Sequence, residues 1–243
     1  MNNQNTIEKM KHMRLSGMAH MHYTNINNNI NLDYTIDQYV GMLVDQEWEN
    51  RENNKIKRLI KSAKFRFPAT IVDIDYTANR QLDKNMFQRL ALLDFVNKHE
   101  NLIITGATGT GKSYLSQALG HQACMMLFKT RYYNTARLMD NLKLARLEGN
   151  YQKSLMVIEK ADLLILDDFG LSAFDNQDRQ SLMDIIESKY DRTSIIISSQ
   201  IPVASWHELI GEGTIADAIL DRIVNSSHRI QLKGESLRKN KLI

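Results

Sequence analysis

The stretch Gly106-Ala107-Thr108-Gly109-Thr110-Gly111-Lys112-Ser113 decides the fold, because it is a complete G-x-x-x-x-G-K-S pattern. Its glycines let the loop wrap closely, so that successive backbone N–H groups point inward at a phosphate. We expect the Lys112 ammonium to reach the β- and γ-phosphates of a nucleotide and the Ser113 hydroxyl to bind Mg²⁺. An apolar run precedes the loop at 102–105 and a predicted helix follows it at 112–128, which is the context that this motif requires. A glycine-rich turn without a ligand is the alternative.

A second signal is an apolar run at 163–166 that ends in Asp167 and Asp168. A strand buried in a parallel sheet delivers its C-terminal residues to the edge where ligands bind. There Asp167 could hold Mg²⁺, and Asp168 could accept a proton from the attacking water or orient it. Acidic residues after a strand are by themselves more often turn or helix-cap residues. Their pairing with the phosphate loop favours the metal and catalytic roles.

Two further polar residues are candidates for contact with the γ-phosphate. Gln200 follows the β-branched run 194–198 and is favoured over its competitor Ser199, although a turn before Pro202 is the alternative reading. Arg222 lies in a predicted helix, where most arginines are simply solvated. In an assembly it could instead reach the γ-phosphate of a neighbouring subunit.

Strand and helix patterns alternate along the second part of the chain. The expected strands are 102–105, 131–133, 163–166, 194–198 and 228–232, and the expected helices are 112–128, 136–147, 151–160, 175–190, 203–209 and 214–224. This alternation predicts an α/β fold, a parallel sheet with helices on both faces.

The first part of the chain is predicted to be helical. A loose apolar pattern covers 6–22, and a stronger one with spacings of three and four covers 35–64, where Thr35 or Asp33 could be the cap and Pro68 the stop. A connector with one helix near 85–97 follows. We therefore expect an N-terminal helical region, 1–67, and a second domain, 68–243.

Composition and charge narrow the class of protein. Of 243 residues, 43% are hydrophobic and 24% charged, which excludes a disordered chain. The polar start, the lack of a long apolar run and a single cysteine, Cys124, favour a cytoplasmic protein that does not enter membranes. The net charge of +3 resides in residues 1–66. Within residues 51–66, Glu52 is the single acidic residue among seven basic ones, so this stretch could bind a polyanion or simply be solvated. The seven basic residues are Arg51, Lys55, Lys57, Arg58, Lys61, Lys64 and Arg66.

The chain resembles the IstB-like ATPases, helper proteins of insertion-sequence transposition that are related to the helicase loader DnaC. The stretches that carry the resemblance are Met13–Met18, Ala63–Phe65, Asn101–Gly106, Leu164–Gly170, Ala216–Arg222, His228–Ile230 and Lys233–Arg238. The phosphate loop is shared with many ATPases, whereas the C-terminal stretches are more particular to this family. The resemblance implies an AAA+ core, ATP-dependent assembly into a ring or helical oligomer on duplex DNA, and recruitment or stimulation of a transposase.

The resemblance also implies roles for single residues. Lys112 and Ser113 would bind ATP and Mg²⁺, Asp167 would be the metal-side carboxylate, Asp168 the catalytic one, Gln200 the sensor and Arg222 the arginine finger. The expected nucleotide-binding set is Gly106, Ala107, Thr108, Gly109, Thr110, Gly111, Lys112, Ser113 and Tyr114. Two positions depart from the AAA+ pattern, which commonly has Glu where Asp168 stands and Asn where Gln200 stands. Because 21 residues follow Arg222 in the sequence, we expect no C-terminal helical lid.

Three other functions stay open from the sequence alone. A helicase loader acting in replication would bind single strands, and the C-terminal stretches argue against it. An adaptor that binds ATP as a switch would hardly turn it over. A small-molecule kinase would need a second substrate pocket, for which no pattern is seen.

Overall fold

A computed structural model describes residues 3–28, 34–211 and 213–237. The chain forms two compact units, residues 1–58 and 59–243. One long helix, α3 (Ile36–Ala63), contributes to both. The functional boundary after residue 67 stays a prediction.

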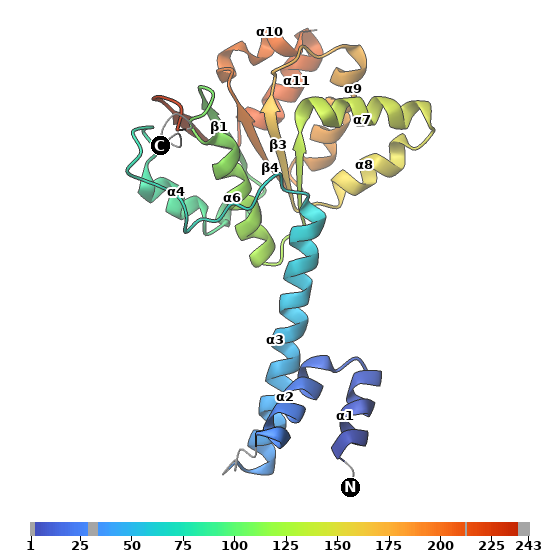
Figure 1. Ribbon diagram of the computed structural model, residues 1–243. Helices are drawn as coiled ribbons and strands as arrows, with labels where there is room; N and C mark the ends of the chain where they lie inside the picture. Colours follow the sequence, from blue (N-terminus) through green and yellow to red (C-terminus); the bar gives the residue numbers. More distant parts are fainter. Residues whose placement is uncertain (1–2, 29–33, 212, 238–243) are drawn as a thin grey trace. The chain divides into compact units, whose positions relative to one another are not determined.

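The larger unit contains a five-stranded, all-parallel sheet (Figure 1). The strands are β1 (Asn101–Gly106), β2 (Thr130–Asn134), β3 (Leu163–Phe169), β4 (Ser194–Ser199) and β5 (Ser227–Leu232), in the order β2-β3-β4-β1-β5. All five expected strands are confirmed. Because the strands are parallel, the loops that follow β1, β3 and β4 meet at one edge of the sheet.

Alternate side chains of the buried strands pack into two hydrophobic cores, one on each face of the sheet. In β1, Ile103 joins one core while Leu102 and Ile104 join the other. The second core is closed by α6 (Lys112–Met125) and the connector, with α4 (Lys84–Leu90) and α5 (Asp94–Asn97). The first is closed by α7 (Thr135–Leu147), α8 (Tyr151–Glu159), α9 (Asn176–Lys189), the 3₁₀ turn η1 (Val203–Ser205), α10 (Trp206–Ile210) and α11 (Gly213–Val224). The expected layering of a sheet between helices is confirmed.

The single helix expected near 85–97 is wrong, because the structure interrupts it. Leu93 adopts a left-handed φ of 62° between α4 and α5, and its side chain is fully buried. The cost of this backbone conformation is offset by burial of the leucine in the core. Packing thus overrides a helical pattern that local sequence favours.

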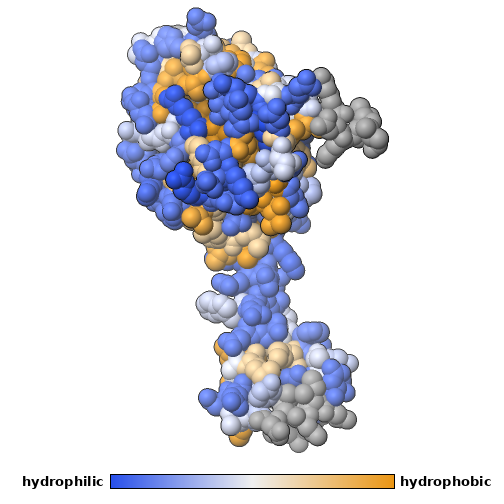
Figure 2. Space-filling view, turned by 90° about the vertical axis from the view of Figure 1, so that its left-hand side faces the viewer, coloured by the Kyte–Doolittle hydropathy of each residue, from blue (hydrophilic) through white to orange (hydrophobic). Residues whose placement is uncertain are grey.

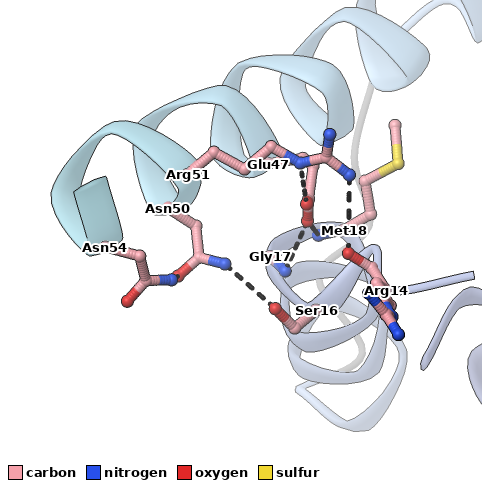
Figure 3. Close-up of polar contacts among 8 residues, drawn as sticks. All are labelled: Arg14, Ser16, Gly17, Met18, Glu47, Asn50, Arg51 and Asn54. Carbon is pink, nitrogen blue, oxygen red and sulfur yellow. Dashed lines mark hydrogen bonds and ion pairs between the residues drawn. The ribbon is translucent and has the colours of Figure 1, made fainter. Parts of the chain in front are cut away.

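The N-terminal unit consists of α1 (Asn3–His12), α2 (Ser16–Asn27) and the first part of α3. The loose pattern over 6–22 is divided at Arg14, whose φ is 60°. Leu15 precedes α2 and offers no side-chain cap. Glu47 of α3 caps the N-terminus of α2 in place of Leu15. The Glu47 carboxylate accepts hydrogen bonds from the backbone N–H groups of Gly17 and Met18 (Figure 3).

The ends of α3 follow local rules. The Thr35 hydroxyl accepts a hydrogen bond from the Gln38 N–H group at 3.3 Å, so Thr35 is the cap. Asp33, the other candidate, lies outside the described residues, as does Arg238. The helix ends at Ala63 because Lys64 adopts a φ of 59°, so the stop comes before Pro68. None of the described helices is long and apolar enough to cross a membrane.

Candidate nucleotide-binding site

The phosphate loop joins β1 to α6. Gly109 and Gly111 take left-handed φ values of 81° and 95°, which only glycine adopts without strain. Lys112 is buried, and its Nζ atom donates to the Ala107 carbonyl oxygen at 2.9 Å. The Thr110 hydroxyl donates to the same oxygen, also at 2.9 Å. The loop is therefore closed on itself by its own side chains.

The Asp167 carboxylate accepts hydrogen bonds from three side-chain hydroxyl groups of the site. This fully buried carboxylate accepts a hydrogen bond from the Ser113 hydroxyl at 2.9 Å and one from the Ser198 hydroxyl on the same oxygen. Its other oxygen accepts from the Tyr132 hydroxyl at 2.8 Å. The structure thus brings together the two residues expected to bind Mg²⁺. One hydroxyl and one carboxylate suit a hard cation that keeps several waters and binds phosphate oxygens.

Asp168 follows directly in the chain but has a different environment. Successive residues of a regular strand point to opposite faces. Here a bulge in the β3–β4 pairing and a φ of 56° at Asp168 redirect the chain. Its carboxylate is half-buried and accepts a hydrogen bond from the Asn134 side-chain amide at 3.0 Å. Burial, reinforced by the charge of Asp167, raises the pKa of Asp168 above the ordinary aspartate value.

Asp168 also lines a cavity of about 170 Å³ between α7 and the loop after β3. The other walls include Asp140, Lys143 and Leu171. A carboxylate with a raised pKa beside open space is suited to receive a proton from water.

Gln200 lies at the phosphate loop, as expected. Its side-chain oxygen accepts a hydrogen bond of 2.6 Å from the Thr108 hydroxyl. Its competitor Ser199 is fully buried and donates to the Phe169 carbonyl oxygen at 2.7 Å. Of the two, only Gln200 has its side chain on the loop.

Tyr114, in the first turn of α6, contacts the connector. The Thr70 N–H group donates to its hydroxyl at 3.4 Å, and its ring stacks on Phe67 with centroids 6.1 Å apart. The segment around 67–70 therefore lies against the start of α6.

Arg222 is not near the phosphate loop of its own chain. The Asn101 side chain, at the start of β1, donates to the Arg222 carbonyl oxygen at 3.3 Å. The phosphate loop begins at the other end of this six-residue strand, roughly 17 Å away at a rise of about 3.3 Å per residue. The Arg222 guanidinium donates to the Ala218 carbonyl oxygen and lies 5.6 Å from the Tyr190 ring centroid. A role at a γ-phosphate therefore requires a second subunit.

Three residues whose side chains hydrogen-bond to the carboxylates of the acidic pair were missed from the sequence: Tyr132, Asn134 and Ser198. Asn134 ends a strand, so the rule that singled out Gln200 could have found it. Tyr132 and Ser198 lie inside strands and gave no separate signal. Their roles follow from the strand order, which places β2 and β4 on either side of β3.

A parallel sheet in the order β2-β3-β4-β1-β5, with a phosphate loop after β1 and an acidic pair at the end of β3, defines a P-loop NTPase of the AAA+ type. Solved structures share this fold. The DnaC helicase loader matches with a TM-score of 0.50 and 22% identity, covering 63% of this chain and 93% of that one. AMPPCP-bound DnaA from Aquifex aeolicus matches with a TM-score of 0.58 and 17% identity, covering 74% and 56%.

The chain belongs to the IstB-like ATP binding protein family, whose sequence model matches residues 8–242. It is 43% identical over 235 residues to the insertion sequence ATP-binding protein y4pL of Sinorhizobium fredii, covering 97% of this chain and 96% of that protein. The resemblance expected from the sequence is confirmed, and the protein is an ATP-binding member of an insertion-sequence family.

Proposed function

We propose that this protein is an ATP-hydrolysing helper of insertion-sequence transposition that assembles on duplex target DNA and recruits or stimulates a transposase. Residues 68–243 form the ATPase domain, and residues 1–67 supply DNA and partner contacts. The observation that carries the proposal is the 2.9 Å hydrogen bond between Ser113 and Asp167, because it joins the phosphate loop to the acidic strand end. Relatives of the chain are named insertion sequence ATP-binding proteins, which supports a role in insertion-sequence transposition.

Each residue of the site has a defined part in hydrolysis. Ser113 and Asp167 would hold Mg²⁺, which would supply neutralisation of the charge on the β- and γ-phosphates. Lys112 exchanges its bond to Ala107 for phosphate oxygens. Asp168 takes the proton of the attacking water, with its carboxylate held by Asn134.

The remaining two residues act on the γ-phosphate. Gln200 orients the attacking water or a γ-phosphate oxygen from the loop side. Arg222 of a neighbouring subunit stabilises the charge of the transition state, which makes turnover depend on the oligomer.

One face of α3 is suited to DNA. Trp48, Arg51, Lys55 and Arg58 follow at spacings of three and four, which places them on one side of the helix. All four side chains are exposed. Figure 2 shows the exposed stretch of α3 as a hydrophilic surface. Lys and Arg contacts to phosphates give affinity without reading bases, so binding should tolerate any sequence and weaken steeply with salt.

The test is the fluorescence anisotropy of a labelled duplex of arbitrary sequence, titrated with protein under ATP·Mg²⁺, ADP·Mg²⁺ or no nucleotide. We expect tight, cooperative DNA binding in the presence of ATP·Mg²⁺ and in neither of the other two conditions. Lys55→Ala with Arg58→Ala should weaken it, whereas the matched pair Lys98→Ala with Lys153→Ala, on exposed positions of the larger unit, should not. DNA binding of equal affinity in all three nucleotide conditions would favour the adaptor. A preference for single-stranded over duplex DNA would favour the helicase loader. Addition of the protein to a strand-transfer reaction of the transposase from the same insertion sequence tests the helper role.

A further inference from the structure

Arg80 is a buried cation outside the residues that the sequence assigned to the site. It lies in the connector and is only 3% exposed. Its Nη2 atom donates to the Asp75 carbonyl oxygen at 2.8 Å and its Nη1 atom to the Thr110 carbonyl oxygen at 3.3 Å. Its Nε atom is buried with no hydrogen-bond partner. The Asp75 carboxylate attracts the guanidinium through its charge, but its hydrogen bonds come from the Thr77 N–H group and hydroxyl and not from Arg80.

This arrangement leaves the guanidinium without a hydrogen-bonded carboxylate, since both of its acceptors are backbone carbonyl oxygens. A guanidinium has five N–H donors and stays charged, so two carbonyl oxygens satisfy it only in part. Burial lowers the pKa of Arg80 below its ordinary value, which reports the unfavourable desolvation. A buried charge is normally retained where a partner ion compensates for it.

The guanidinium lies directly against the phosphate loop. A Cβ atom built on Gly111 would come within 2.4 Å of the Arg80 Nη1 atom. Gly111 precedes Lys112, so the two cations flank the same turn of backbone. The absence of a side chain at Gly111 is what admits Arg80 to this position.

A second segment fixes Arg80 and the loop together. The Lys233 N–H group donates to the Arg80 carbonyl oxygen at 3.0 Å, and the Leu237 N–H group donates to the Gly109 carbonyl oxygen at 3.0 Å. The chain after β5 therefore spans from the connector to the loop. The position of Arg80 behind the loop is fixed before any ligand binds, so little ordering is needed on binding.

We propose that Arg80 is a nucleotide-binding residue: it holds the phosphate loop from its outer side and supplies a second positive charge beside Lys112 that attracts the polyphosphate. The proposal rests on the ATP binding proposed above. Because ATP carries more negative charge than ADP, the contribution of Arg80 is larger for ATP. A purely structural arginine would weaken both nucleotides alike.

The test compares mant-ATP and mant-ADP titrations of the full chain, in the presence of Mg²⁺, for the wild type and the variants Arg80→Met, Arg80→Gln and Arg80→Lys. Arg80→Gln retains amide donors without the charge and covers the case in which Arg80→Met does not fold. Arg89→Met, at an exposed position of α4, is the matched control. Melting curves without nucleotide show which variants are folded.

We expect the neutral variants to lose about tenfold in affinity for mant-ATP, a change of about 1.4 kcal/mol, and clearly less for mant-ADP. Arg80→Lys should recover most of the loss, and Arg89→Met should match the wild type. An unchanged ratio of ATP to ADP affinity in folded neutral variants, or an Arg80→Lys variant as weak as the neutral ones, overturns the role of Arg80 alone. A wild type that binds neither nucleotide overturns the proposed function as well.

Discussion

The side-chain amide of Asn134, at the end of β2, donates a 3.0 Å hydrogen bond to the Asp168 carboxylate at the end of β3. The two strands are neighbours in parallel register, with Asn134 paired to Asp167. The orientation of the proposed catalytic base therefore depends on the adjacent strand, and not on the phosphate loop.

Asn134→Ala is expected to lower ATP turnover about tenfold with little change in ATP affinity, because an unheld carboxylate is less often aligned with the attacking water. Phosphate release and mant-ATP titration measure the two quantities. Asn141→Ala, an exposed position on α7, is the matched control. An equal loss of affinity would place Asn134 in nucleotide binding instead.

The pH dependence of turnover should report Asp168. The proposed base acts in its ionised form, so the rate falls as pH drops through its pKa, and burial places that pKa above the ordinary aspartate value. The hydrogen bond from Asn134 lowers the same pKa. Asn134→Ala should therefore shift the acid limb of the kcat profile to higher pH. An acid limb at the same pH in both proteins would contradict the assignment of Asp168 as the base.

Turnover should require two subunits, because Arg222 lies at the opposite end of β1 from its own phosphate loop. Asp168→Asn and Arg222→Ala are each expected to reduce ATP hydrolysis at least about a hundredfold. A mixture of the two variants should regain part of the activity, since one subunit supplies Asp168 and its neighbour supplies Arg222. Recovery in the mixture is measured as phosphate release against protein concentration.

Three results would revise this picture. Absence of recovery in a mixture that still co-assembles would place Arg222 outside the active site. Full turnover by Asp168→Asn would mean that a different group is the base. Negligible turnover by the wild type, with no loss of function in Asp168→Asn, would favour the adaptor that uses ATP as a switch.

Glu47 is expected to stabilise the N-terminal unit without affecting the stability of the larger unit. Glu47→Ala leaves the N–H groups of Gly17 and Met18 without their acceptor, at a cost of about 2 kcal/mol. Hydrogen exchange should rise in α2 and stay unchanged in α6. Glu49→Ala, on an exposed position of the same helix, should change neither.

The same contact should also be sensitive to acid. Burial works against ionisation, but hydrogen bonds from Arg51, Gly17 and Met18 hold the pKa of Glu47 below its usual value. Its stabilising effect is therefore present above the ordinary glutamate pKa and is lost as pH falls through the lower folded value. Protection of α2 that persists at pH values below that range would contradict this role.

The sequence by itself determined the features whose signals are local. The loop from Gly106 to Ser113 needs glycines at fixed positions, and β1, β3 and β4 each contain a continuous β-branched or apolar run. The family follows from short stretches that stay recognisable without coordinates. Gln200 and the acidic pair could be found because they stand where strands end, and parallel strands end at a common edge.

Only the tertiary structure decided which distant side chains meet. The strand order sets Tyr132 and Ser198 on either side of Asp167, and packing makes Leu93 interrupt a helix that its neighbours favour. Arg80 and Glu47 gave no signal in the sequence, since an arginine in a connector and a glutamate in a helix are ordinary. Their significance comes from burial beside backbone groups 30 residues away, at Thr110 and Gly17. Burial removes water as the alternative partner, and that depends on the whole fold.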